Sequence, residues 1–133
     1  MEEILKYLKE GAIGAFATVN DGKPDVRPWQ FQFAQDGKLY FATANNKEVY
    51  RQMQKNPYIA FTTTNEDFTT VRLYGQAVFT DDISIKEKIM EKQEGIRNIY
   101  KSADNPVFEA FYIEHGEAVI SDFSGNPPRR ITF

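Results

Sequence analysis

Hydrophobic and polar residues alternate most regularly in residues 25–35. Aromatic side chains occupy one set of alternate positions and amides the other: Trp29, Phe31 and Phe33, against Gln30 and Gln32. Because successive side chains of a strand point to opposite faces, this pattern predicts a strand with one apolar and one polar side. Asp36-Gly37 predicts a two-residue hairpin turn, after which residues 38–43 form the returning strand.

The length of the hairpin loop also predicts the register of the two strands, because a two-residue loop fixes which residues are opposed. The expected pairs are Phe33 with Tyr40, Phe31 with Ala42, Trp29 with Ala44, and Gln30 with Thr43. Extended further, the same register brings Arg27 beside Asn46 and Lys47.

Other segments show helical or strand periodicity. Helices are predicted at 2–10, 82–94 and 96–101, and strands at 13–19, 58–64, 69–80 and 107–122 with a last short strand after 124–130. Within 107–122, His115-Gly116 marks either a bulge or a tight turn. Strands joined mostly by hairpins, with a few helices between them, predict an antiparallel barrel of the α+β class.

Several residues are expected to begin or end helices. Asn45 can cap a helix that follows the hairpin, and Glu48 three residues later completes a capping-box pattern. This helix is expected to end at Asn56, which can adopt a left-handed conformation before a proline. Gly11 and Gly95 are expected to end the helices that precede them.

Composition restricts the function further. A length of 133 residues suits a single domain, 1–133, and a net charge of −3 without a basic run argues against a nucleic-acid partner. Zero Cys and a single histidine, His115, exclude thiolate and multi-histidine metal sites. No apolar run or signal sequence points to a membrane, so we expect a cytoplasmic protein. The aromatic content of 14% favours strands and a wall for a flat ligand.

Polar residues gather where the returning strand ends and the next helix begins. Thr43, Asn46 and Lys47 lie at this helix N-terminus, whose free N–H groups and partial positive charge suit a phosphate. The register delivers Arg27 to the same corner, although only a local twist at Pro28 would turn its side chain away from the aromatic face. These residues therefore predict either an anion site or a solvated strand end beside a capped helix.

The order and spacing of several segments resemble the pyridoxamine 5′-phosphate oxidase-like FMN-binding split-barrel family, especially its short nitroimidazole-resistance-type branch. These segments are 26–33 (Val-Arg-Pro-Trp-Gln-Phe-Gln-Phe), 37–43 (Gly-Lys-Leu-Tyr-Phe-Ala-Thr), Asn46-Lys47, Asn56-Pro57 and 71–77 (Val-Arg-Leu-Tyr-Gly-Gln-Ala). The resemblance implies an α+β, mainly β, six-stranded antiparallel split barrel with a few flanking helices. It also implies a homodimer with FMN at the subunit interface.

The resemblance and the residue pattern together give an expected FMN site on the second and third strands and the helix start. Its residues are Arg27, Pro28, Trp29, Gln30, Gln32, Ala42, Thr43, Asn46 and Lys47. Phe123 and Arg129 are candidates to reach the flavin of a neighbouring subunit. Thr70 stands where longer members of the family carry a glutamine.

The function implied by the resemblance is an FMN-binding oxidoreductase that passes reducing equivalents from NAD(P)H through flavin to a small electrophilic acceptor. Because a flavin supplies its own redox chemistry, no catalytic side chain or metal is expected, and His115 is expected to be a turn or surface residue. The alternatives are a non-catalytic carrier of FMN or deazaflavin, a haem-binding barrel, and a dimerisation module with an empty groove.

Overall fold

A computed structural model describes all residues, 1–133, as ten strands and four helices. The elements are α1 (Glu2–Tyr7), β1 (Ile13–Asn20), β2 (Lys23–Gln30), β3 (Phe33–Gln35), β4 (Lys38–Ala44), α2 (Glu48–Lys55), β5 (Tyr58–Thr64), β6 (Thr70–Gln76), β7 (Val78–Thr80), α3 (Ile83–Lys92), α4 (Glu94–Tyr100), β8 (Phe108–Ile113), β9 (Glu117–Ser121) and β10 (Arg129–Thr132). No helix combines the length and apolar character needed to cross a bilayer.

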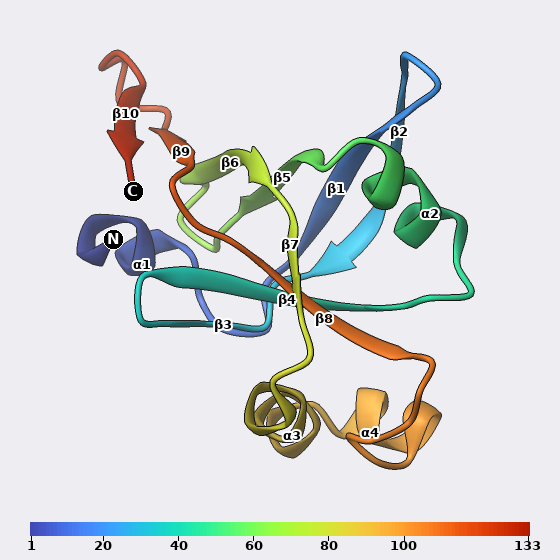
Figure 1. The fold of residues 1–133 in the computed structure, drawn as a ribbon. Coiled ribbons are helices and arrows are strands. Elements are labelled where there is room, and N and C mark those ends of the chain that lie inside the picture. The colour runs from blue at the N-terminus through green and yellow to red at the C-terminus, as the bar shows by residue number, and fades with distance from the viewer.

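The strands form two antiparallel sheets (Figure 1). One has six strands in the order β10-β9-β6-β5-β1-β2, and the other has four in the order β3-β4-β8-β7. Helices α3 and α4 lie together at one end of the molecule, and α2 lies beside the β1–β2 hairpin. The α+β, mainly β, antiparallel split barrel predicted from the sequence is therefore confirmed.

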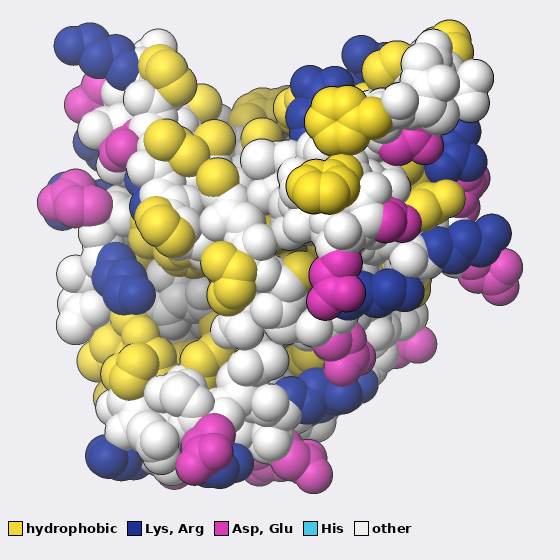
Figure 2. All heavy atoms as spheres, turned by 180° about the vertical axis from the view of Figure 1, so that it is seen from behind, with side chains coloured by type: hydrophobic (Ala, Val, Ile, Leu, Met, Phe, Trp, Pro, Cys, Tyr) yellow, Lys and Arg dark blue, Asp and Glu magenta, His cyan; other side chains and the backbone are white.

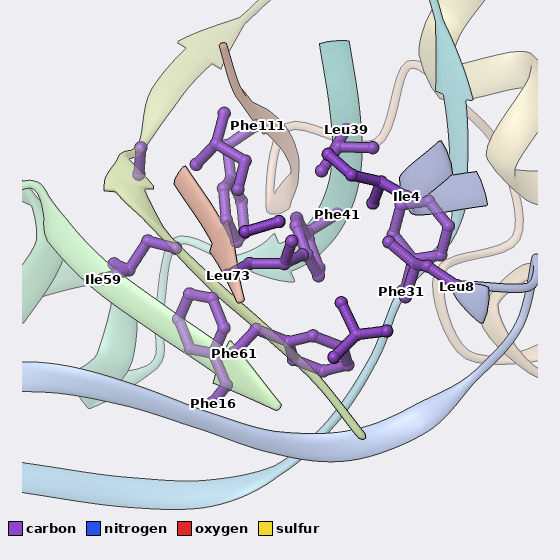
Figure 3. Close-up of a cluster of buried hydrophobic side chains, with 14 of the residues drawn as sticks. Ile4, Leu8, Phe16, Phe31, Leu39, Phe41, Ile59, Phe61, Leu73 and Phe111 are labelled. Carbon is purple, nitrogen blue, oxygen red and sulfur yellow. The ribbon is translucent and has the colours of Figure 1, made fainter. Parts of the chain in front are cut away.

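Phenylalanine rings dominate the core between the two sheets (Figure 3). Five rings are fully buried in this core, namely Phe16, Phe31, Phe41, Phe61 and Phe111, and two more, Phe33 and Phe108, are fully buried in a second cluster with residues of α3. Phe41 and Phe111, from adjacent strands of the smaller sheet, stack with their centroids 5.5 Å apart. Since burial of one such side chain contributes ~1.5–3 kcal/mol, these rings account for much of the stability of the fold.

The segment predicted as one strand at 25–35 is two strands in different sheets. The predicted pair of Phe33 with Tyr40 is confirmed, but Trp29 lies opposite Gly14 rather than Ala44. The expected pairs of Phe31 with Ala42 and of Gln30 with Thr43 are wrong for the same reason. The backbone N–H of Phe31 donates to Ala12 O at 2.9 Å. At Phe31 the chain is therefore still bonded to the segment before β1, and it passes to the smaller sheet only after this residue. A hairpin turn fixes register only as far as the strands remain paired.

The crossing also changes where Arg27 lies. Arg27 pairs with Phe16 on β1, so the predicted register that placed it beside Asn46 and Lys47 is wrong. Pro28 lies on β2, an edge strand, where its missing N–H costs no ladder hydrogen bond.

Tertiary contacts also move the predicted helix ends. The side chain of Asn45 donates to Pro106 O at 2.7 Å and caps no helix, so α2 begins after Lys47 with no side-chain cap. Asn56 is extended, with φ −144°, rather than left-handed. Gly95 lies in the first turn of α4 and does not end α3.

Three further boundaries differ from the prediction. Helix α1 ends at Tyr7, because Leu8 is extended and buried in the core. The strand predicted at 69–80 divides into β6 and β7 around Ala77, whose N–H donates to Pro57 O. His115 has φ +54° at a bend where the chain passes from β8 in one sheet to β9 in the other, so it does not form a bulge within a continuous strand.

Substitution of Gly14 is expected to destabilise the fold, because β1 and β5 approach closely at this residue. A Cβ on Gly14 would lie 2.0 Å from Thr62 O, a backbone atom that cannot rotate away. We expect Gly14→Ala to lower the free energy of unfolding in urea by roughly 2–3 kcal/mol or more. Gly95→Ala is the control, since its Cβ meets nothing within 4 Å, and it should stabilise by roughly 0.5–1 kcal/mol. Equal midpoints for Gly14→Ala and the wild type would contradict this interpretation.

Candidate flavin site

An open cavity of about 350 Å³ lies between the end of β2, the end of β4 and helix α4. Its lining residues are Ile13, Pro28, Trp29, Gln30, Gln32, Ala42, Thr43, Lys47, Ile96, Ile99, Tyr100 and Phe108. From behind, the molecule is hollowed on the side where α4 lies, and hydrophobic side chains gather around the hollow (Figure 2). Its volume and mixed lining are those of a small-molecule site.

All the residues predicted for the cofactor line this cavity except Arg27 and Asn46. The structure thus brings together residues from β2, from the crossing segment between β2 and β3 (Phe31 and Gln32), from β4 and from the start of α2. Asn46 is an exposed turn residue outside the lining. The wall formed by α4 was not predicted as part of a site.

Three buried side-chain atoms have no hydrogen-bond partner, and all three belong to residues that line the cavity: Trp29 Nε1, Gln32 Oε1 and Thr43 Oγ1. Gln32 and Thr43 are each only 3% exposed. A buried polar atom without a partner costs about 1–3 kcal/mol, and native proteins contain few of them. Their concentration at one place makes this cavity a candidate site for a polar ligand.

The cavity reaches the N-terminus of α2 at Lys47. No side chain caps this helix of eight residues, so its first N–H groups are free to bind an acceptor. Lys47 is exposed and lines the cavity, which puts a positive charge beside these N–H groups. Thr43 Oγ1 is the nearby unpartnered hydroxyl on β4. A cation, a hydroxyl and free N–H groups are the chemistry that holds a phosphate.

On the other side, Gln30 links the cavity to the helical end of the molecule. Its Nε2 donates to Gly11 O at 3.1 Å and to Gln93 Oε1 at 3.4 Å. Beyond Gln93, Ile96 and Tyr100 of α4 face the cavity one turn apart. Burial raises the pKa of Tyr100, so its hydroxyl stays protonated at neutral pH.

Sequence periodicity contained a signal for this wall. Ile96, Ile99 and Tyr100 occupy the i, i+3 and i+4 positions that form one helical face. The pattern identifies an apolar face but not what it faces, so only the fold shows that it forms a wall of the cavity.

Arg27 is held on β2 by other groups. One guanidinium nitrogen donates to Thr18 Oγ1 at 2.8 Å and to Phe16 O, and the other to Gln52 Oε1 at 3.1 Å. Asp25 Oδ2 lies 3.3 Å from the second nitrogen. Both terminal nitrogens of Arg27 therefore have partners within this chain, and Arg27 does not line the cavity.

The other residues considered from the sequence lie away from the cavity. Exposed His115 lines a separate pocket with Tyr58 and Tyr74. Phe123 is 88% exposed at a loop, and Arg129 forms an ion pair with Glu3. Thr70 Oγ1 makes a hydrogen bond with Thr64 Oγ1 on β5.

Two packed antiparallel sheets and an aromatic core define this protein as a small split barrel, which has an open cavity at the end of β2 and β4. The sequence model described as pyridoxamine 5′-phosphate oxidase matches residues 1–119. The chain belongs to this family.

Solved structures are similar over nearly the whole chain. A NimC/NimA family protein of Clostridium acetobutylicum is 31% identical with a TM-score of 0.88, over 100% of this chain and 92% of that chain. General Stress Protein 26 of Bacillus anthracis is 20% identical with a TM-score of 0.82, over 99% and 97%. A pyridoxamine 5′-phosphate oxidase-related, FMN binding protein of Nostoc punctiforme is 17% identical with a TM-score of 0.74, over 90% and 79%. No protein of curated function matches the sequence significantly.

Removal of the unpartnered hydroxyl of Thr43 is expected to stabilise the ligand-free protein. Thr43→Val replaces a buried hydroxyl that lacks a partner, so the free energy of unfolding should rise by roughly 1–2 kcal/mol. Thr63→Val is the matched control, because Thr63 Oγ1 donates to Ile13 O at 2.8 Å, and it should lose about 1 kcal/mol. Urea denaturation measures both changes. Equal losses in the two variants would show that Thr43 is satisfied in solution.

Proposed function

We propose that the cavity binds FMN and that the protein is an FMN-dependent oxidoreductase that passes reducing equivalents from NAD(P)H to a small electrophilic acceptor. The observation that carries the proposal is the coincidence of the three unpartnered buried atoms with the predicted cofactor residues. Family membership supports it, and one structural relative is described as FMN binding.

The phosphate end is assigned to the start of α2. Lys47 supplies the positive charge, Thr43 a hydroxyl, and the first turn of α2 its free N–H groups. A phosphate monoester needs several donors at once, and this corner supplies them from two elements. Asn46 lies in the turn beside Lys47, and it remains part of the proposed cofactor site although it does not line the cavity.

The ring end is assigned to β2 and the crossing segment. Trp29 Nε1 is a donor and Gln32 Oε1 an acceptor, so together they match a heteroaromatic edge that carries both carbonyl and N–H groups. Pro28 and Gln30 continue the same wall, and Ala42 on β4 leaves room for a chain between ring and phosphate. Trp29 is fixed by stacking on Phe16 at 4.8 Å, so the wall is rigid.

Bound FMN supplies hydride transfer, and the residues of this chain bind, orient and shield it. The side chains of Ile96 and Tyr100 on α4 leave a surface open on the far side of the cavity from β4. A flat nicotinamide or acceptor can pack there without a dedicated charged site. A non-catalytic FMN carrier would need the same binding residues but no such access.

We also propose a homodimer in which the second subunit packs on part of the rim of the cavity. Ile13 and Ile99 line the cavity and are 65% and 69% exposed, so its rim is apolar and open in one chain. A second copy would bury these two side chains and leave the side of the cavity at Ile96 and Tyr100 open to a substrate.

The visible absorption spectrum of freshly purified protein tests the cofactor. We expect flavin bands that pass to the filtrate after heat denaturation, and fluorescence titration of flavin-free protein with FMN should saturate at one FMN per chain. Steady NAD(P)H oxidation with a quinone or nitroaromatic acceptor then separates an oxidoreductase from a carrier. Failure of FMN to bind at micromolar concentration would remove the proposal.

Lys47→Met tests the phosphate end. We expect FMN affinity to fall by ~1–3 kcal/mol, the cost of losing a charged hydrogen bond, while riboflavin, which lacks the phosphate, binds as before. Lys55→Met, at the other end of α2 and about 12 Å away along a helix of eight residues, is the control for charge alone. Equal affinities of the two variants for FMN would place the phosphate elsewhere.

Sedimentation equilibrium tests the dimer. The expected mass is twice the 15.3 kDa of one chain at micromolar concentration. Ile99→Glu should shift the protein toward the monomer, because it buries a charge in the apolar rim. A wild-type mass of one chain would contradict this part of the proposal.

A further inference from the structure

Tyr100 is the last residue of α4 and lines the cavity on the side of this helix. Its ring packs on the fully buried ring of Phe108, with the two centroids 5.1 Å apart. Its backbone oxygen accepts from Asn105 Nδ2 at 2.8 Å and from Ser102 N–H at 2.9 Å. Contacts of both the ring and the main chain therefore fix the phenol in the wall of the cavity.

Around the proposed ring end of the cavity, no other lining residue can release a proton at neutral pH. The polar side chains there are two amides and an indole, from Gln30, Gln32 and Trp29, and none of them ionises in this range. Lys47 also lines the cavity, but it lies at the N-terminus of α2, where the phosphate is assigned. Tyr100 is thus the acid closest to where a substrate would meet the ring.

The hydroxyl of Tyr100 is available to a ligand. Burial raises the pKa of Tyr100, and no hydrogen bond or charged group contributes to this shift. The group therefore carries its proton at neutral pH and has no acceptor within the chain that competes for it. It can donate this proton to an oxygen of similar basicity.

The surroundings of Tyr100 also restrict the kind of acceptor. Ile96 lies beside Tyr100 on the open side of the cavity, and no lining residue of α4 is a cation that would bind a carboxylate or a phosphate. A quinone is flat and uncharged, so it suits an apolar surface. The hydroquinone formed from it is itself a phenol, so its oxygen has a basicity close to that of a tyrosine side chain. Proton transfer between the two is nearly balanced in free energy, which favours general acid catalysis.

We propose that Tyr100 is a catalytic residue, the proton donor to an acceptor of the quinone class that binds on the open side of the cavity. This inference rests on the proposed FMN-dependent function, and it adds the class of the acceptor and the acid that serves it.

The proposed step balances in protons and electrons. A hydride from the reduced cofactor brings two electrons and one proton to the quinone, and negative charge develops on a quinone oxygen. The Oη–H bond of Tyr100 breaks as an O–H bond forms on this oxygen, and the tyrosinate then takes a proton from water on the open side of the cavity. Each turnover consumes one quinone, one NAD(P)H and one proton from water, and it yields one hydroquinone and one NAD(P)⁺.

Tyr100→Phe tests the inference in the FMN-loaded protein, because it keeps the ring on Phe108 and removes only the hydroxyl. We expect the rate constant for oxidation of the reduced protein by menadione, a quinone, to fall about 100-fold or more, the usual contribution of a general acid. Reduction by NAD(P)H and oxidation by ferricyanide, which takes electrons without protons, should keep their wild-type rates. Tyr58→Phe is the control, since Tyr58 lines a separate pocket, and it should change none of these rates.

Binding of 4-nitrophenolate to the oxidised, FMN-loaded protein gives a readout without turnover, because its oxyanion imitates the charge that develops on the acceptor. Tyr100→Phe should weaken this binding about tenfold or more, since a hydrogen bond to a charged group is lost. The neutral ether 4-nitroanisole should bind both proteins equally.

Three results would each overturn the role of Tyr100 and leave the FMN site in place. They are an unchanged menadione rate in Tyr100→Phe, an equal loss of rate with ferricyanide, and an unchanged affinity for 4-nitrophenolate. A wild-type protein that binds no FMN would instead contradict the proposed function, and with it the role of Tyr100.

Discussion

The site depends on the way the chain crosses from one sheet to the other at Phe31 and Gln32. Phe31 N–H donates to Ala12 O, and Phe31 O accepts from Gly11 N–H, each at 2.9 Å. One residue later, Gln32 N–H donates to Tyr40 O in the other sheet. Burial of Phe31 in the core holds the crossing, since exposing such a ring costs about 1.5–3 kcal/mol. β2 therefore ends on one side of the cavity and β4 on the other, and the cavity opens where the sheets separate.

The same rigidity explains why polar atoms remain without partners. Trp29 is stacked on Phe16 and cannot rotate its N–H toward another acceptor, and Thr43 is fixed by the pairing of β4 with β8. A looser site would rearrange and satisfy these groups internally. Here they remain without partners, and the aromatic core offsets their cost. These residues therefore lower the stability of the ligand-free chain.

Sequence periodicity predicted much of the fold because strand faces and helix faces are local properties. The hairpin between Phe33 and Tyr40 is correct, and so are the general positions of the helices. The errors lie where a distant residue competes for a local group: Asn45 bonds to Pro106 instead of capping α2.

The sequence also predicted only part of the candidate site. Gln30, Gln32 and Thr43 line one cavity, although the register used to bring them together was wrong. The predicted and the observed arrangements both bring these three residues together, because all three lie at strand ends next to the crossing between β2 and β3. The α4 wall could not be predicted, since it depends on the packing of a helix more than fifty residues away from Thr43 in the sequence.

Arg27 shows what a resemblance between sequences transfers and what it does not. The resemblance implies a phosphate role for the arginine on β2, but the partners of a guanidinium depend on residues outside the motif, here Thr18 and Gln52. To reach a phosphate, Arg27 would have to leave two buried acceptors and the carboxylate of Asp25. The side chain of Lys47 makes no hydrogen bond or ion pair in the structure, and it lines the cavity. In the ligand-free chain, a lysine beside free helix N–H groups therefore offers the chemistry of a phosphate site more directly than the arginine does.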